Sequence, residues 1–207
     1  SFFSDNFIFE DGSFFYDFNE NEPLDITEKQ DEDDIAAILY TSGTTGKSKG
    51  AMLSQKNLLS NALTLSKSWG FTVSDVLLHA LPIYHTHGLF VATNIALVSS
   101  SQIRFLKKFN EDEIIANLPS TTVMMGVPTF YTRLLANRKF NKETTKNMRL
   151  FISGSAPLLK ETHEKFEYRT GHKILERYGM TETNMITSNP YNGERKAGTV
   201  GLALEDV

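Results

Sequence analysis

The stretch from Arg149 to Tyr178, RLFISGSAPLLKETHEKFEYRTGHKILERY, decides the fold class. It begins with a short apolar run over 149–153, continues with a helical pattern over 157–170 and ends with a second apolar run over 173–178. Gly171 stands where a helix commonly ends, because glycine adopts the left-handed backbone of a helix C-terminus at little cost. A strand, a helix and a second strand of these lengths predict a crossover unit with parallel strands.

The preceding sequence repeats this alternation. Ser54 is expected to cap a helix over 55–68, and Asn110 with Glu113 predicts an Asn variant of the capping box at the start of a helix that ends at Leu118. The other expected strands cover 35–40, 76–81, 103–106 and 121–125, and the other expected helices cover 88–98 and 128–136. We therefore predict an α/β layered sheet, at least partly parallel, with residues 35–40 as a buried strand.

Composition excludes several classes of protein. The 207 residues are 40% apolar and 22% charged, which suits a globular chain with a substantial core. A net charge of −4 argues against binding nucleic acid through phosphate neutralisation. The chain has no cysteine, which excludes disulfides, thiolate zinc sites and cysteine catalysis. We expect no membrane span and no signal peptide, and because the first residue is not Met we expect a fragment.

Charge is distributed unevenly along the chain. Residues 1–34 carry twelve acidic residues and one basic residue, and seven of the fifteen Phe lie in the same segment. An acidic tail that binds a partner would fit this pattern, but the turn sequences Asp11-Gly12 and Glu22-Pro23 favour a peripheral hairpin and linker. We therefore predict an acidic, Phe-rich peripheral segment and linker over 1–33, followed by the α/β portion over 34–207.

A Gly-rich loop follows the first expected strand. Residues 41–50, TSGTTGKSKG, combine three glycines and two lysines with hydroxyl side chains. Glycines let backbone N–H groups approach an anion, while hydroxyls and lysines add hydrogen bonds and charge. The end of the loop, Gly46-Lys47-Ser48, matches a Walker A motif, but Thr41 occupies the position of its first glycine. The loop is therefore predicted to bind polyphosphate without being a P-loop, and a plain hairpin turn remains the structural alternative.

Three ordered motifs carry a resemblance to a known family. Tyr40–Gly50 resembles the phosphate loop of the adenylate-forming (ANL) superfamily, which contains acyl-CoA synthetases, luciferases and peptide-synthetase adenylation domains. Residues 81–88, LPIYHTHG, resemble its second core motif, and residues 178–182, YGMTE, resemble the motif that holds adenine and magnesium. Ser48 departs from the Pro of many members. The sequence context of these motifs is most similar to that of malonyl-CoA synthetases.

The resemblance implies a set of site residues. ATP would be bound by Thr41, Ser42, Gly43, Thr44, Thr45, Gly46, Lys47, Lys49, Gly154, Ser155, Ala156, Glu176, Tyr178, Gly179, Met180 and Thr181. Lys49, Thr181 and Glu182 would take part in catalysis, with Mg²⁺ held by Glu182 and Thr44. His85 and His87 could instead be zinc ligands, since residues two apart share one face of a strand. The resemblance favours a role at the acyl pocket for both.

The resemblance also implies the reaction. A carboxylate attacks the α-phosphorus of ATP, pyrophosphate leaves, and coenzyme A converts the acyl adenylate into a thioester. Malonate, or methylmalonate, keeps a second carboxylate that needs a cation, and Arg177 directly before the YGMTE motif is the candidate, helped by His85 or His87 and by Ser155. The family's ribose-binding Asp and C-terminal Lys have no counterpart here, so the chain alone is expected to be inactive, without the swinging C-terminal domain.

Two other functions stay open at the level of the sequence. The first is an adenylating enzyme for another carboxylate, such as a fatty acid, or one that loads a carrier protein. The second is a non-catalytic remnant that binds nucleotide only. The expected location is the bacterial cytoplasm, or the mitochondrial matrix in a eukaryote.

Overall fold

The computed structural model describes residues 29–41 and 49–205. The chain divides into the units Ser1–Asp31 and Glu32–Val207, and the elements below belong to the second unit. The predicted peripheral segment lies almost entirely outside the described residues. No helix among the described residues is long and apolar enough to cross a membrane.

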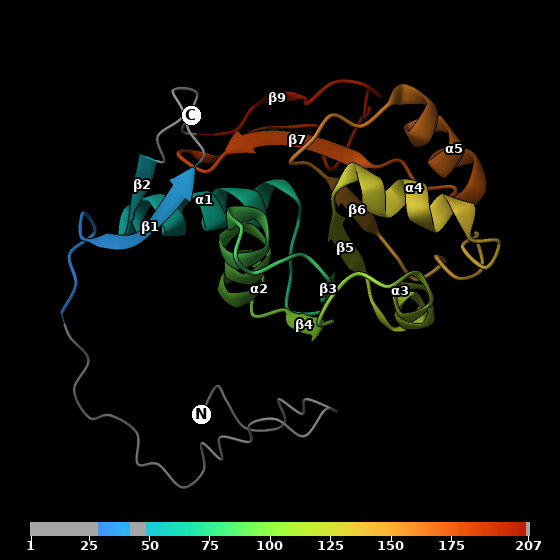
Figure 1. Cartoon of the computed structure of the whole chain (residues 1–207), viewed down its shortest axis with the longest axis horizontal. Coiled ribbons are helices and arrows are strands. Elements are labelled where there is room, and N and C mark those ends of the chain that lie inside the picture. Colours follow the sequence, from blue (N-terminus) through green and yellow to red (C-terminus); the bar gives the residue numbers. More distant parts are fainter. Residues whose placement is uncertain (1–28, 42–48, 206–207) are drawn as a thin grey trace, which may run out of the picture. The chain divides into compact units, whose positions relative to one another are not determined.

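The described chain alternates strands and helices (Figure 1). In chain order the elements are β1 (Ile35–Thr41), β2 (Lys49–Ser54), α1 (Gln55–Ser68), β3 (Val76–His79), the π-helical turn η2 (His87–Ala92), α2 (Thr93–Val98), β4 (Gln102–Phe105), α3 (Glu111–Asn117), the 3₁₀ turn η3 (Leu118–Ser120), β5 (Val123–Gly126), α4 (Pro128–Ala136), β6 (Leu150–Ser153), α5 (Lys160–Thr170), β7 (Leu175–Met180), β8 (Asn184–Ser188) and β9 (Leu202–Ala203).

The larger sheet has seven strands in the order β4-β3-β5-β6-β7-β8-β9. Strands β4, β3, β5, β6 and β7 run parallel, whereas β8 and β9 are antiparallel additions that the sequence patterns did not predict. The α/β layered fold with a mainly parallel sheet is therefore confirmed.

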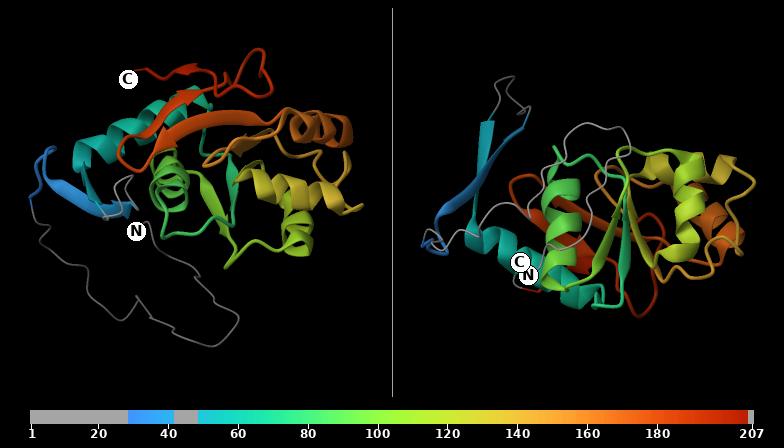
Figure 2. Two further views of the ribbon diagram at one scale, coloured as in Figure 1. Left: turned by 45° about the horizontal axis from the view of Figure 1, so that its top comes forward. Right: turned by 90° about the horizontal axis from the view of Figure 1, so that it is seen from below.

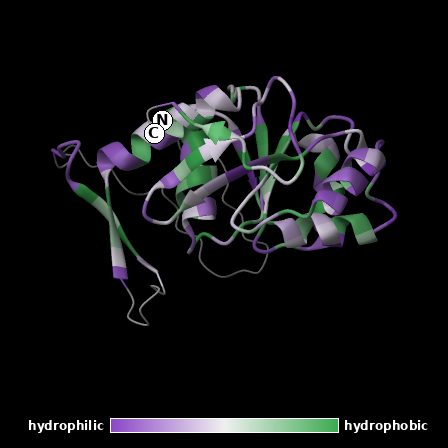
Figure 3. Cartoon of the chain, turned by 90° about the horizontal axis from the view of Figure 1, so that it is seen from above, coloured by the Kyte–Doolittle hydropathy of each residue, from purple (hydrophilic) through white to green (hydrophobic). Residues whose placement is uncertain are grey.

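Helices cover both faces of this sheet (Figure 2). Alternate strand residues point to opposite faces, so Leu77 packs with α1 and α2 while its neighbour Leu78 packs with α3, α4 and α5. Both clusters contain fully buried large side chains, such as Trp69 in the first and Phe166 in the second. Figure 3 shows hydrophobic stretches along the strands and a mixture of hydrophilic and hydrophobic residues along the helices.

The predicted helix ends are largely reproduced. The Ser54 side chain accepts a hydrogen bond from the Asn57 backbone N–H, and the Ser54 backbone N–H donates one to the Asn57 side-chain oxygen, which completes a capping box. The Asn110 side chain caps α3 by accepting from the Glu113 N–H. Gly171 ends α5 with a φ of 79°. Two starts differ, since α5 begins at Lys160 rather than 157, and the expected helix 88–98 opens with the π-helical turn.

The strand predicted over 35–40 is present as β1, but the prediction that it is buried was wrong. β1 pairs only with β2, in a separate two-stranded antiparallel sheet, and its Tyr40 side chain is 77% exposed. Ile35 and Ile38 are also more than half exposed. An apolar run fits an exposed hairpin strand and a buried strand equally well, because its pattern does not record which neighbour pairs with it. Figure 3 shows this apolar stretch on the hairpin.

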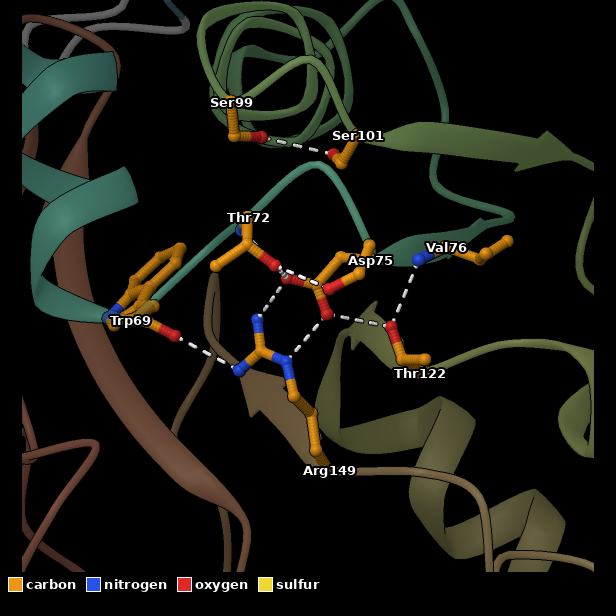
Figure 4. Close-up of polar contacts among 9 residues, drawn as sticks. Trp69, Thr72, Asp75, Val76, Ser99, Ser101, Thr122 and Arg149 are labelled. Carbon is orange, nitrogen blue, oxygen red and sulfur yellow. Dashed lines mark hydrogen bonds and ion pairs between the residues drawn. The ribbon is translucent and has the colours of Figure 1, made fainter.

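A partly buried ion pair connects the amino ends of the parallel strands (Figure 4). Arg149, before β6, contacts both carboxylate oxygens of Asp75 at 2.6 and 2.7 Å and donates to the Trp69 carbonyl at 3.1 Å. Asp75 also accepts hydrogen bonds from Thr72 and Thr122. The cluster therefore joins the end of α1 to the starts of β3, β5 and β6, at the edge opposite the candidate site.

Candidate functional site

The candidate site lies at the carboxyl ends of the parallel strands. β3, β6 and β7 run in the same direction, so the segments that follow them meet at one edge of the sheet. These segments are the loop leading to η2, the Gly154-Ser155-Ala156 turn and the end of β7. The structure thus brings together His87, Gly154, Ser155 and Arg177, which are four of the predicted site residues.

Arg177 is the central group of this edge. Its side chain is buried, and its Nε and Nη2 atoms find no hydrogen-bond partner anywhere in 29–41 and 49–205. The guanidinium lies directly on Gly154, where a Cβ atom would stand only 2.4 Å from Arg177 Cζ. Burial lowers the pKa of Arg177 to about 10, which leaves it cationic at neutral pH. An unpaired buried cation of this kind needs an anion.

His87 is buried on the same side of the site. Its Nδ1 lies 3.2 Å from Ser155 Oγ, and its Nε2 is buried without a hydrogen-bond partner in the described structure. Burial, followed by the charges of Arg177 and His79, holds the pKa of His87 well below its ordinary value, so the ring is neutral. If Ser155 donates to Nδ1, Nε2 carries the proton and can donate to an anion.

The two predicted histidines do not share one environment. His85 is exposed, and its ring packs against Tyr84 with centroids 4.6 Å apart. His87 starts a helical turn rather than following His85 along a strand, so the strand geometry behind the zinc alternative does not occur. No group of three possible metal ligands was found within the described part of the chain. Only His87 therefore lies beside Arg177 and Ser155.

Tyr131, which the sequence patterns missed, supports the site, and the predicted Ser155 has a backbone conformation that they did not indicate. Tyr131 is fully buried at the start of α4, donates to the Ile152 carbonyl at 2.5 Å and lies within the electrostatic reach of Arg177. Ser155 adopts a left-handed backbone, with a φ of 68°, which is strained for a residue other than glycine. From sequence alone, a Tyr in a helix cannot be told from an ordinary core residue. No sequence pattern predicts a Ser with a left-handed backbone.

The YGMTE motif occupies a tight hairpin. Tyr178, Gly179 and Met180 end β7, while Thr181 and Glu182 lie in the turn to β8. A Cβ at Gly179 would stand 2.0 Å from the Asn184 carbonyl oxygen, so the hairpin requires glycine there. Glu182 is exposed and borders a groove of ≈ 280 Å³ between α1 and β8.

Glu176 faces away from Arg177, as alternation along β7 requires. Its buried carboxylate accepts a hydrogen bond from the Gly198 N–H at 3.1 Å and lies 3.4 Å from His163 Nδ1. The structure thus places this predicted nucleotide-binding residue in a buried contact between β7, α5 and the segment around Gly198. Ala156 is exposed beside Ser155.

The predicted phosphate loop is described only at its two ends. Thr41 and Lys49 are cross-strand partners in the β1–β2 hairpin, and Lys49 is exposed. Ser42, Gly43, Thr44, Thr45, Gly46, Lys47 and Ser48 lie outside the described residues. Their role in phosphate binding remains a prediction.

Glu182, which the resemblance names as an Mg²⁺ ligand, has an exposed carboxylate. Mg²⁺ commonly takes one or two carboxylates together with substrate phosphates and water, rather than a cage of protein ligands. Glu182 is accessible in its turn next to Thr181, which fits that donor set.

Comparisons with known proteins agree with this geometry. The AMP-binding enzyme family matches residues 5–207. A malonate–CoA ligase of Arabidopsis thaliana is 41% identical over 84% of this chain and 32% of its own length. A mitochondrial malonate–CoA ligase of Mus musculus is 40% identical over 83% of this chain and 32% of its own length. The chain therefore spans about a third of the length of these relatives.

Solved structures show the same similarity. The ATP-bound MatB of Rhodopseudomonas palustris is 63% identical and superposes with a TM-score of 0.84, covering 86% of this chain and 35% of that one. A malonyl-CoA ligase with methylmalonyl-CoA and AMP bound is 38% identical, with a TM-score of 0.81 over 86% of this chain and 40% of its own. With its motifs, its parallel sheet and this match over nearly the whole chain, the protein belongs to the AMP-binding enzyme family, the adenylate-forming superfamily that includes the acyl-CoA synthetases.

Proposed function

We propose that this chain forms the carboxylate-binding and nucleotide-binding part of an ATP-dependent CoA ligase whose substrate is malonate. The observation that carries the proposal is the buried Arg177, which is cationic at neutral pH and has two nitrogens without a hydrogen-bond partner in the described structure. Relatives named malonate–CoA ligase support the same assignment.

The charge balance favours a dicarboxylate over a fatty acid. When one carboxylate of malonate reacts, the other stays anionic, and burying it without a partner would be very costly. Arg177 can bind that carboxylate through two parallel hydrogen bonds. A fatty acid would instead place an apolar chain beside Arg177. The buried cation would then keep no anionic partner, which disfavours binding.

His87 complements Arg177 as a neutral donor. Because its pKa is held well below the ordinary value, it stays uncharged over the physiological range. A second cation would repel Arg177, whereas a neutral Nε2–H can donate without that penalty. The Nδ1–Ser155 contact orients the ring. We assign to Arg177 the neutralisation of the carboxylate's charge. His87 would donate one hydrogen bond to the same carboxylate.

The reaction follows in two steps. An oxygen of the reacting carboxylate attacks the α-phosphorus of ATP, the bond to the leaving pyrophosphate breaks, and malonyl adenylate remains. The thiol of coenzyme A then attacks the activated carbonyl carbon, loses its proton and expels AMP. Thr181 would bind the α-phosphate and Glu182 would hold Mg²⁺, whose chemical contribution is to neutralise phosphate charge. Lys49 and residues 41–47 would bind the β- and γ-phosphates.

The test is a carboxylate panel in the full-length protein. Malonate, methylmalonate, butyrate and a long-chain fatty acid are assayed for AMP release with and without coenzyme A. We expect malonate or methylmalonate to give the highest kcat/KM and Arg177→Met to reduce it at least about a hundredfold, roughly 2.7 kcal/mol, with little change in the KM for ATP. Relative activity on butyrate should rise.

Arg133→Met is the matched control, because Arg133 lies on α4, where it pairs with Glu111 at the surface. It should leave malonate activity unchanged. Wild-type malonate turnover in Arg177→Met would refute the role of Arg177. A preference for fatty acids, or adenylate formation without thioester formation, would assign the family chemistry to a different carboxylate or acceptor.

A further inference from the structure

One side-chain hydrogen bond joins two segments of the site that are 98 residues apart in sequence. Thr86 Oγ1 donates to Asn184 Oδ1 over 2.8 Å. Thr86 belongs to the loop that brings His87 beside Arg177, and Asn184 directly follows the turn that carries Thr181 and Glu182. The bond therefore connects the carboxylate-binding half of the site with the proposed phosphate-binding half.

The chain directly after Thr86 is held in place by hydrogen bonds to Gly88. Thr86 precedes the π-helical turn η2, whose second residue, Gly88, accepts hydrogen bonds on its carbonyl from His79 Nε2 at 2.9 Å and from Thr93 Oγ1 at 3.0 Å. His79 is buried and packs against Phe105 of β4. A movement of Thr86 would therefore be passed to His87, its chain neighbour.

The Asn184 end is buried and has a left-handed backbone. Asn184 is 2% exposed and has a φ of 54°, a conformation that most residues with a Cβ avoid and that asparagine adopts more readily. Its carbonyl accepts from Thr183 Oγ1 and packs against Gly179, so it also determines the shape of the Tyr178–Glu182 hairpin. Such a conformation persists only where neighbours over-determine it, commonly at functional sites.

The same hairpin is held from its other side. Asn61 of α1 donates to the Met185 carbonyl at 2.7 Å and accepts from the Met185 N–H at 3.3 Å. These bonds anchor the start of β8 to a helix, but they do not reach the loop that bears His87. The Thr86–Asn184 hydrogen bond links that loop to the residue that follows the turn, next to the apolar packing of Leu81 and Val91 with Met185.

We propose that Thr86 and Asn184 are positioning residues that set the distance between the Arg177–His87 pocket and the Thr181–Glu182 turn. The inference rests on the proposed function. Adenylation requires a carboxylate oxygen close to, and in line with, the α-phosphorus, and an error of about 1 Å can cost on the order of a hundredfold in rate. Both binding halves persist without the bond, so its loss should lower kcat more than it weakens either substrate.

The experiment compares Thr86→Val, which removes the hydroxyl at constant shape, with Thr86→Ser, which keeps it. In the full-length protein, kcat and the KM values for ATP and carboxylate are measured by pyrophosphate release, together with Tm. We expect Thr86→Val to lower kcat about tenfold with KM values within about twofold, and Thr86→Ser to remain near wild type. In an Asn184→Gly background, which tolerates the positive φ, Thr86→Val should add little.

The outcomes separate this inference from the proposed function. If the wild type prefers a different carboxylate, the same series is run with that substrate, because positioning does not depend on its identity. If the wild type adenylates nothing, the function fails, and amide hydrogen exchange at residues 180–184 decides the inference instead. We then expect faster exchange there in Thr86→Val than in Thr86→Ser. Unchanged kcat, equal losses in both variants, or equal exchange would overturn it.

Discussion

Two arginines lie at opposite ends of the parallel strands, Arg149 partly buried and Arg177 fully buried, and their surroundings differ in kind. Arg149, at the amino ends, meets both carboxylate oxygens of Asp75 and the Trp69 carbonyl. Arg177, at the carboxyl ends, has Nε and Nη2 without a partner in the described structure. Burial lowers the pKa of both groups, but the hydrogen bonds and charge of Asp75 raise that of Arg149 above its usual value.

The comparison separates a structural cation from a binding one. The Arg149 guanidinium also lies against the rings of Phe71 and Tyr191, at 5.3 and 5.1 Å from their centroids. The charge of Arg149 is neutralised within the fold by the Asp75 carboxylate. The charge of Arg177 is not balanced by the described residues, so its burial lowers the stability of the free protein, and an anionic ligand restores it.

The largest expected effect is on stability. In the full-length protein, Arg149→Met should reduce unfolding free energy by about 3–5 kcal/mol, because it leaves the Asp75 carboxylate buried without its cation. Arg177→Met should leave stability unchanged or raise it by about 1 kcal/mol, because it removes a desolvated and unpaired charge. Denaturant titration of both variants without ligand measures the difference. Equal losses in the two would contradict the distinction drawn here.

A second variant tests the contact between Arg177 and its strand neighbour. Gly154→Ala places a methyl group where the guanidinium lies, at 2.4 Å from Cζ. We expect the KM for malonate to rise on the order of tenfold, which corresponds to about 1.4 kcal/mol, while the KM for ATP stays near wild type. In an Arg177→Met background, the same substitution should have little further effect on malonate. Additive losses would show that Gly154 acts independently of Arg177.

The smallest expected effect concerns pH. Burial lowers the pKa of Arg177 to about 10, and lysine starts from a lower ordinary value, so in Arg177→Lys the same burial should bring the amine close to neutral pH. Only the protonated form attracts malonate, so binding is lost as pH rises through the lowered pKa. We expect the KM for malonate in this variant to rise about fivefold from pH 6.5 to 8.5, against less than twofold in the wild type. A flat profile in Arg177→Lys would contradict this account.

Sequence patterns recovered the elements whose signals are local. The helix over 128–136 was predicted with its observed ends, as proline at its first position and the apolar spacing require. The caps at Ser54 and Asn110 and the glycine after α5 were also correct, because each depends on a hydrogen bond or backbone angle within a few residues. The exposed hairpin of β1 and β2 was missed, because pairing between strands is not encoded in the period of either one.

The site residues show the same contrast between what short motifs indicate and what only the fold shows. The resemblance to the family named Arg177, His87 and Ser155 as candidates, and it assigned roles to the neighbouring Thr181 and Glu182. It could not separate His85 from His87, because both are His residues of one short loop, whereas only the fold buries one and exposes the other. The nucleotide role of Glu176 stays a prediction, and only the fold shows that its carboxylate lies toward His163 and Gly198.

Periodicity, helix caps and short motifs are properties of neighbouring residues. They were therefore enough to predict the class of fold, the family and the kinds of chemical group at the site. Only the tertiary structure decided which cation is paired, since Arg149 and Arg177 are the same residue type at the two ends of the sheet. The partner of Arg149 is Asp75, 74 residues earlier in the chain. Long-range packing brings that carboxylate to one arginine and leaves the other facing a neutral histidine and a glycine.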